Sequence, residues 1–270
     1  MPHPDRREVT ELPTLTALFG ANHHFALYWI VLARIGGVFA VAPIVSSAAI
    51  PAPVRAALSV LVAIAALPAA AATAPHIPIG VVPYSALLVH ELAVGLIIGF
   101  VARVVFSVAD MAGSLIDLQM GFSVGSAVDP LYGESSTVLG TFLNMLAMLL
   151  FLVAGGLELL VAASAASYTH LPIGAPAFFG AGSAAAVSAL AWAMATAVAV
   201  AVPALALGLV LNLALGLVGR AVPQLNVFAS ALPLQVIAGL VALLLSLPVM
   251  AVVFSGLAGE TVTWIGRLVP

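Results

Sequence analysis

A long stretch without a single formal charge is the strongest constraint on this chain. Between Glu158 and Arg220 no Asp, Glu, Lys or Arg occurs, and most of the residues there are apolar. The whole chain of 270 residues is 64% hydrophobic and only 6% charged, with a mean hydropathy of +1.26. A soluble domain carries about 25% charged residues, so this chain lacks the charge to cover a water-exposed surface. We therefore predict an all-α polytopic membrane protein.

Six apolar segments can be delimited, and a helix that crosses a bilayer needs about 20 residues. The segments cover 25–45, 57–72, 84–108, 138–163, 181–219 and 232–258. Polar connections are expected at 46–56, 73–83, 109–137, 164–180 and 220–231. Pro203 lies near the middle of the fifth segment and is expected to kink or divide it, because proline removes a backbone hydrogen bond. We place one integral membrane domain at 25–260, between a polar N-terminal segment, 1–24, and a C-terminal tail, 261–270.

Missing residue types exclude several classes of function. The chain has no Cys, so it has neither disulfides nor thiolate metal ligands. It has no Lys and a net charge of −3, which argues against nucleic-acid binding and excludes a P-loop. His90-Glu91 opens an HExxH zinc pattern, but Val94 occupies the second ligand position. The run from Gly121 to Gly125 matches GxSxG, yet a helical pattern precedes it where a nucleophile elbow needs a strand. We expect no enzyme activity, no metal and no cofactor.

Charged residues inside apolar segments are costly and are therefore functional candidates. Arg34, Glu91 and Glu158 are of this kind. Arg103, Asp110 and Asp117 are spaced by seven residues, about two turns of an α-helix, so they predict a polar stripe with Ser114 beside it. A helix end that simply leaves the membrane would give the same pattern, and the residues alone leave this alternative open.

The polar connection 109–137 is unusual for a membrane protein because it combines glycines, hydroxyls, acids and Pro130 in one long segment. Irregular backbone at membrane depth persists only where it is buried in protein or lines water. The segment is therefore expected to plug or line a pore.

Small residues recur at helical spacing in two apolar segments. Gly95 and Gly99 form a GxxxG pair, and Gly208, Asn212 and Gly216 repeat every four residues. Such faces allow close approach of helices. Packing within the chain and packing against other subunits both fit the pattern.

Two separated blocks of sequence resemble one family. Residues 90–130, HELAVGLIIGFVARVVFSVADMAGSLIDLQMGFSVGSAVDP, are similar to the central block of the FliR family of flagellar type III export-gate proteins, whose injectisome counterpart is SctT. Residues 211–228 resemble the family's Arg-x-x-Pro-Gln-Leu-Asn signature. Members often have Asn-Gly-His after the fourth apolar run, where this chain has Gly155-Gly156-Leu157 and then Glu158. That departure removes any role of the His.

The resemblance implies a fold, a function and partners. Helical hairpins of one such chain join several copies of FliP-like and FliQ-like membrane proteins in a closed cone, the entrance pore for unfolded flagellar substrates. FlhA- and FlhB-like components complete the apparatus in the inner membrane at the flagellar basal body. A flagellar or an injectisome system fits, and the residues alone also permit a secondary solute transporter with a site at 109–137.

The resemblance also implies roles for individual residues. In the family the segment after the third helix reaches into the lumen, and here that segment is 119–130. The expected plug and lining residues are Gln119, Met120, Gly121, Phe122, Ser123, Gly125, Asp129 and Pro130. The expected contacts to a neighbouring subunit are Arg220, Pro223, Gln224 and Asn226.

Overall fold

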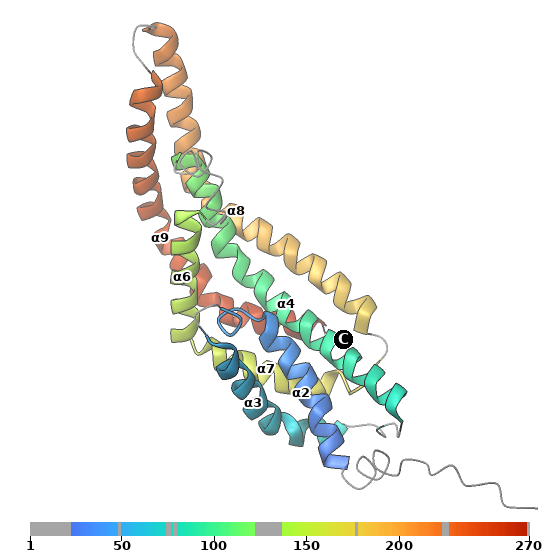
Figure 1. Ribbon diagram of the computed structural model, residues 1–270. Coiled ribbons are helices and arrows are strands. Elements are labelled where there is room, and N and C mark those ends of the chain that lie inside the picture. Colours follow the sequence, from blue (N-terminus) through green and yellow to red (C-terminus); the bar gives the residue numbers. More distant parts are fainter. Residues whose placement is uncertain are drawn as a thin grey trace, which may run out of the picture.

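The protein, as a computed structural model, is built from α-helices throughout its described residues, 23–47, 50–73, 77, 80–121, 137–175, 178–222 and 227–268 (Figure 1). The helices are α2 (His23–Val41), α3 (Ala52–Thr73), α4 (Val81–Met120), α6 (Val138–Val153), α7 (Gly156–His170), α8 (Phe178–Ala221) and α9 (Val227–Leu268). Four of them, α3, α4, α8 and α9, are long and apolar enough to cross a membrane, and α6 with α7 forms a bent fifth candidate. The prediction of an all-α polytopic membrane protein is confirmed.

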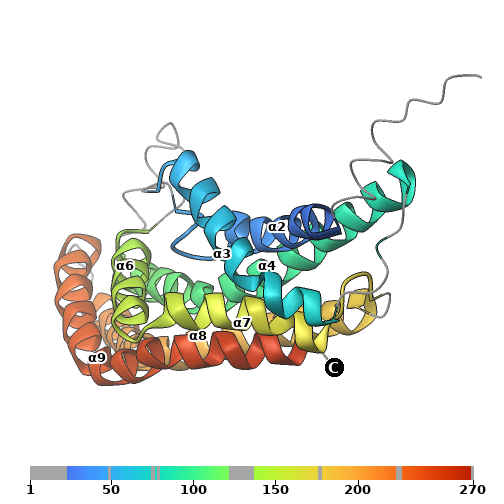
Figure 2. The ribbon, with the colours of Figure 1, turned by 90° about the horizontal axis from the view of Figure 1, so that it is seen from below.

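Helix α4 is the central element of the bundle. It contacts α2, α6, α8 and α9, and Figure 2 shows it lying between α2 on one side and α8 and α9 on the other. In its most apolar stretch 61% of the residues are buried within the chain, against 22% in each of α8 and α9. Helices α8 and α9 therefore present most of their apolar surface outward.

The third apolar helix is longer than predicted. The polar connection expected at 109–137 is wrong for its first part, because α4 continues without a break to Met120. The buried residues Ala109, Ala112, Ile116 and Met120 keep an apolar face at helical spacing. The polar residues that suggested a connection lie on another face of the same helix.

The fourth apolar segment is two helices and not one. The single span predicted at 138–163 breaks after Val153, and α6 and α7 meet at a bend of 71°. Gly155 adopts the left-handed conformation with φ of 71°, which a residue with a side chain rarely takes. The connection predicted at 164–180 is correspondingly shorter, because α7 runs to His170.

Glycines set the close crossing of α2 and α4. A methyl group on Gly95 would overlap the backbone carbonyl of Arg34, and one on Gly99 would lie 2.5 Å from the carbonyl oxygen of Val38. On the facing helix, a methyl group on Gly37 would lie 2.7 Å from the carbonyl oxygen of Leu92. The GxxxG pair therefore serves packing within the chain.

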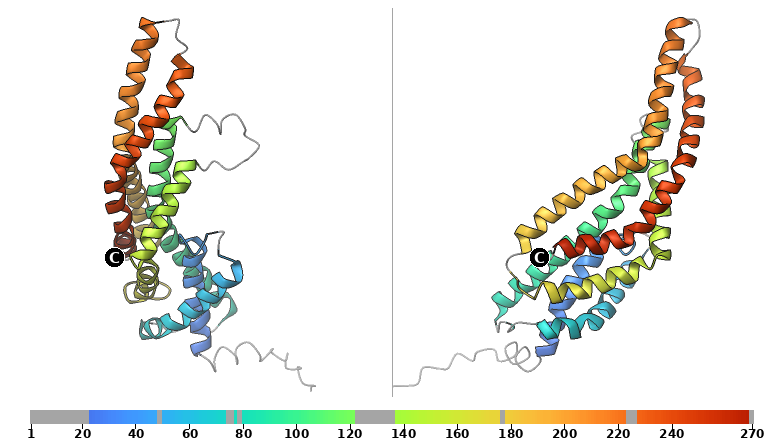
Figure 3. Two further views of the ribbon diagram at one scale, coloured as in Figure 1. Left: turned by 90° about the vertical axis from the view of Figure 1, so that its left-hand side faces the viewer. Right: turned by 180° about the vertical axis from the view of Figure 1, so that it is seen from behind.

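Helices α8 and α9 form a hairpin that projects beyond the rest of the bundle (Figure 3). Helix α8 continues unbroken through Pro203 and changes direction along its length, so the proline does not divide it. Its 44 residues span about 66 Å, more than twice the bilayer core of about 30 Å. Helix α9 runs to Leu268, so most of the expected tail 261–270 is helical.

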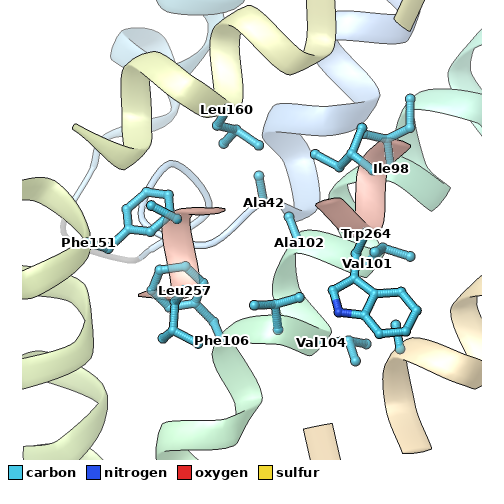
Figure 4. Close-up of a cluster of buried hydrophobic side chains, with 14 of the residues drawn as sticks. Ala42, Ile98, Val101, Ala102, Val104, Phe106, Phe151, Leu160, Leu257 and Trp264 are labelled. Atoms are coloured by element: carbon cyan, nitrogen blue, oxygen red, sulfur yellow. The ribbon is translucent and has the colours of Figure 1, made fainter. Parts of the chain in front are cut away.

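Large aromatic side chains fill the junction where α4, α6, α7 and α9 meet (Figure 4). The rings of Phe106 and Phe151 pack edge to face with centroids 4.7 Å apart, and buried Leu257 of α9 lies with them. Such ring pairs stabilise a core beyond their buried area. This cluster joins the base of the α8–α9 hairpin to the central helix.

Candidate functional site

One stripe of α4 changes from exposed apolar residues to buried polar ones along the helix axis. Exposed Leu92, Leu96 and Phe100 precede Arg103, which is also exposed. One and two heptads further on, Asp110 is half-buried and Asp117 is 2% exposed. The three predicted charges therefore lie on one helix and one stripe, and they become more buried toward the end of α4.

The acidic end of this stripe contacts the start of α6. Thr137 caps α6 by accepting a hydrogen bond from the Gly140 N–H at 3.0 Å, and its hydroxyl lies 3.4 Å from that of Ser114. Asp117, which is 2% exposed, lies against the backbone of Leu139 in the first turn of α6. Asp117 and Ser114 thereby join the end of α4 to the residue at which the chain returns.

Gln119 and Met120, the first two predicted plug residues, form the end of α4 and lie between α8 and α9. Met120 is 1% exposed. Gly121 ends the helix in the left-handed conformation with φ of 75°, which favours glycine. Phe122, Ser123, Gly125, Asp129 and Pro130 lie outside the described residues.

A buried ion pair links α2 to α4, and it joins two residues that the sequence marks as costly charges but does not pair. Arg34 Nε donates to Glu91 Oε2 at 2.6 Å, and both side chains are 0% exposed. The only sequence signal was that each is a lone charge in an apolar segment, which favours a partner of opposite charge.

The ion pair also holds α7 and the residues after it. Arg34 Nη1 donates to the Leu171 carbonyl at 3.0 Å and lies 3.3 Å from the Ser167 hydroxyl, and the guanidinium stacks on the Tyr168 ring 4.2 Å from its centroid. Glu91 Oε1 accepts the backbone N–H of Gly174 at 2.9 Å. Four segments, α2, α4, α7 and 171–175, thus converge on two charges in an apolar bundle.

One of the predicted subunit-contact residues, Arg220, lies at the end of α8, toward the tip of the α8–α9 hairpin. Arg220 is exposed in the last turn of α8, and it makes no hydrogen bond or ion pair with any described residue. Pro223, Gln224 and Asn226 lie outside the described residues. Nearer the base, the Gln235 amide donates to the Asn212 side-chain oxygen at 3.1 Å and ties the two helices together.

Among the described residues, no group of three or more His, Asp or Glu side chains could hold a metal ion. Gly121 follows the helix α4, whereas a nucleophile elbow requires a strand at that position. Glu158 is exposed on α7, and His90 lies 3.4 Å from Glu91 beside the buried ion pair.

The fold and these contacts define a class: a polytopic helical membrane protein with a polar stripe on its central helix and a long apolar hairpin. Residues 25–261 match the family of bacterial export proteins, family 1, and the chain belongs to this family. It is 34% identical to the flagellar biosynthetic protein FliR of Caulobacter vibrioides over 84% of this chain and 90% of the relative.

Further relatives come from flagellar and secretion systems. The flagellar biosynthetic protein FliR of Escherichia coli is 30% identical over 83% of this chain and 85% of its own length. The secretion system apparatus protein SsaT of Salmonella typhimurium is 31% identical, over 60% of this chain and 63% of its own length. The flagellar relatives are thus matched over more of both chains.

Proposed function

We propose that this chain is a subunit of the flagellar type III protein export gate in the bacterial inner membrane. The observation that carries the proposal is the match of residues 25–261 to the export family, together with flagellar relatives that align over most of both chains. The chain acts as a structural component of a channel and not as an enzyme. The family assignment also favours this function over the alternative of a secondary solute transporter.

The outer surface supports assembly with other membrane proteins. Exposed leucines and valines continue along both helices of the α8–α9 hairpin, for instance Leu217 at 71% and Val252 at 74%. Each helix is more than 60 Å long, so a bilayer core of about 30 Å covers only part of this surface. Partner helices of the FliP-like and FliQ-like kind would cover the rest.

The segment 119–130 would act as the plug of the gate. A closure that holds back ions yet releases a polypeptide must depend on weak, reversible packing. Met120 and Phe122 supply apolar contacts, and methionine adapts easily to new surroundings. Asp129 precedes Pro130 and is biased to an extended conformation, which suits the end of the plug. The root of the plug, at Gln119 and Met120, is held inside the bundle.

Purification of the tagged chain from mild-detergent extracts of its host, followed by native mass determination, tests the proposal. One copy together with several copies of two smaller polytopic proteins is the expected result. Recovery of the chain alone, or only with itself, would overturn the proposed function.

Replacing Arg220 with alanine is expected to reduce the amount of partner recovered in this purification several-fold. The exposed guanidinium has no partner among the described residues and is free to bind a neighbouring subunit. The matched control is Arg267→Ala, which removes the same charge from the last turn of α9, where Arg267 stacks on Trp264 of its own chain. Equal recovery from both variants would contradict the contact assigned to Arg220.

Deleting 122–130 is expected to leave assembly intact and to raise the ion leak through the membrane. The deletion starts after Gly121 so that Gln119 and Met120 keep their places between α8 and α9. Leak is measured as loss of membrane potential in cells that express the gate, and recovered partners report assembly. A deletion variant that assembles and holds the potential as well as the wild type would exclude the plug.

A further inference from the structure

We infer that Gly208 and Gly239 are positioning residues of the gate, which form a socket that fixes the root of the plug between α8 and α9. The inference rests on the proposed function. It identifies the part of the chain that controls where the plug begins. It makes the α8–α9 hairpin the element that sets the position of Gln119 and Met120.

The socket has one glycine on each helix of the hairpin. A methyl group on Gly208 of α8 would overlap the Gln119 side chain, and one on Gly239 of α9 would overlap the stem of Met120 and lie 2.8 Å from its sulfur. The two neighbouring side chains at the end of α4 thus occupy the places where the hairpin lacks side chains. Figure 3 shows the end of α4 beside the base of the projecting part of the hairpin.

The socket has an upper limit on the side of the hairpin tip. Asn212 lies one helical turn beyond Gly208, and Gln235 lies one turn beyond Gly239 in the same direction. Their hydrogen bond of 3.1 Å holds α8 and α9 together at that level. The two helices are therefore held together directly beyond the level at which Met120 lies.

This steric arrangement couples the plug to the hairpin. Because Gln119 and Met120 fill the socket, a change that separates or shifts α8 and α9 changes where the end of α4 is held. Packed interfaces of this kind change between discrete arrangements and do not deform continuously. Methionine has the conformational freedom to leave one packing arrangement and adopt another. The hairpin also carries Arg220 and the exposed apolar surface, so binding of partner subunits would set the closed position of the plug.

The experiment compares glycine variants that differ only in what an added methyl group meets. Gly208→Ala and Gly239→Ala displace Gln119 and Met120, whereas Gly36→Ala in α2 and Gly180→Ala in the first turn of α8 place a methyl group in open space. Ion leak and partner recovery are measured for each. We expect a several-fold higher leak for the two socket variants with unchanged recovery, and wild-type leak for the two controls.

A rescue variant separates displacement of Met120 from loss of its side chain. Met120→Ala leaves the socket empty and is expected to leak, and the double variant Met120→Ala with Gly239→Ala is expected to leak less than either single change. Met120→Ala only removes volume and is therefore expected to accumulate. If Gly239→Ala alone does not accumulate, the comparison of Met120→Ala with the double variant still tests the inference. Socket variants as tight as the controls, or leaks that add in the double variant, would overturn the inference. The proposed function would fail separately, through loss of partners from the wild-type chain.

Discussion

A Glu91→Ala variant is expected to accumulate poorly in membranes and to unfold at a much lower temperature than the wild type. The substitution leaves the Arg34 guanidinium charged inside the bundle, where it is 0% exposed. It also removes the acceptor for the Gly174 N–H. Breaking a buried ion pair by removing one partner costs about 3–5 kcal/mol. Membrane yield and the thermal unfolding midpoint in detergent measure the loss.

Two further variants test whether the broken ion pair causes the instability of Glu91→Ala. Glu158→Ala removes the same charge from an exposed site on α7 and is expected to behave as the wild type. Arg34→Met combined with Glu91→Leu removes both charges, and a buried pair replaced by apolar residues often loses little stability. This double variant should therefore recover part of the loss. A double variant worse than the sum of the single changes would show that the ion pair is not the source of the instability.

The pairing of Arg34 with Glu91 could not be predicted from one sequence. Arg34 and Glu91 were recognisable as costly charges in apolar segments, but 57 positions separate them and no periodicity connects them. Their pairing depends on the crossing of α2 and α4, which the glycines allow. Ser167, Leu171 and Gly174 could not be predicted as partners, because the bend between α6 and α7 brings them to the pair.

Hydropathy located the helices better than it located their ends. The order of the apolar segments followed from composition, since a charge-poor run must be buried in lipid or protein. Their number did not, because the fourth segment is two helices. The apolar segment was predicted to end at residue 108, whereas α4 ends at Met120. The polar residues on one stripe of the helix resemble a connection when the apolar residues on its other face are not considered. Spacing of seven residues did predict that Arg103, Asp110 and Asp117 share that stripe. That spacing already implies a helix as far as Asp117, and the other face of this helix buries small residues such as Ala112 and Gly113.

A Gly95→Ala variant is expected to be strongly destabilised, although the change adds one methyl group. That group would overlap the backbone carbonyl of Arg34 and lie 2.8 Å from its carbonyl carbon. Backbone cannot rotate aside as a side chain can, so α2 and α4 must separate. Overpacking of a core costs about 1–3 kcal/mol, and separation also stretches the Arg34–Glu91 ion pair. The thermal unfolding midpoint should fall, and the variant should accumulate less in membranes.

Two glycines of α2 provide the internal test of this explanation. Gly37→Ala also meets backbone on α4, with 2.7 Å to the carbonyl oxygen of Leu92, and is expected to destabilise in the same way. Gly36→Ala, its neighbour, places the methyl group where nothing lies within 4 Å. Alanine is favoured over glycine inside a helix by about 1 kcal/mol, so Gly36→Ala should be neutral or slightly stabilising. Similar unfolding midpoints for all three variants would mean that close contact of α2 and α4 does not limit stability, and that the GxxxG pair serves another surface.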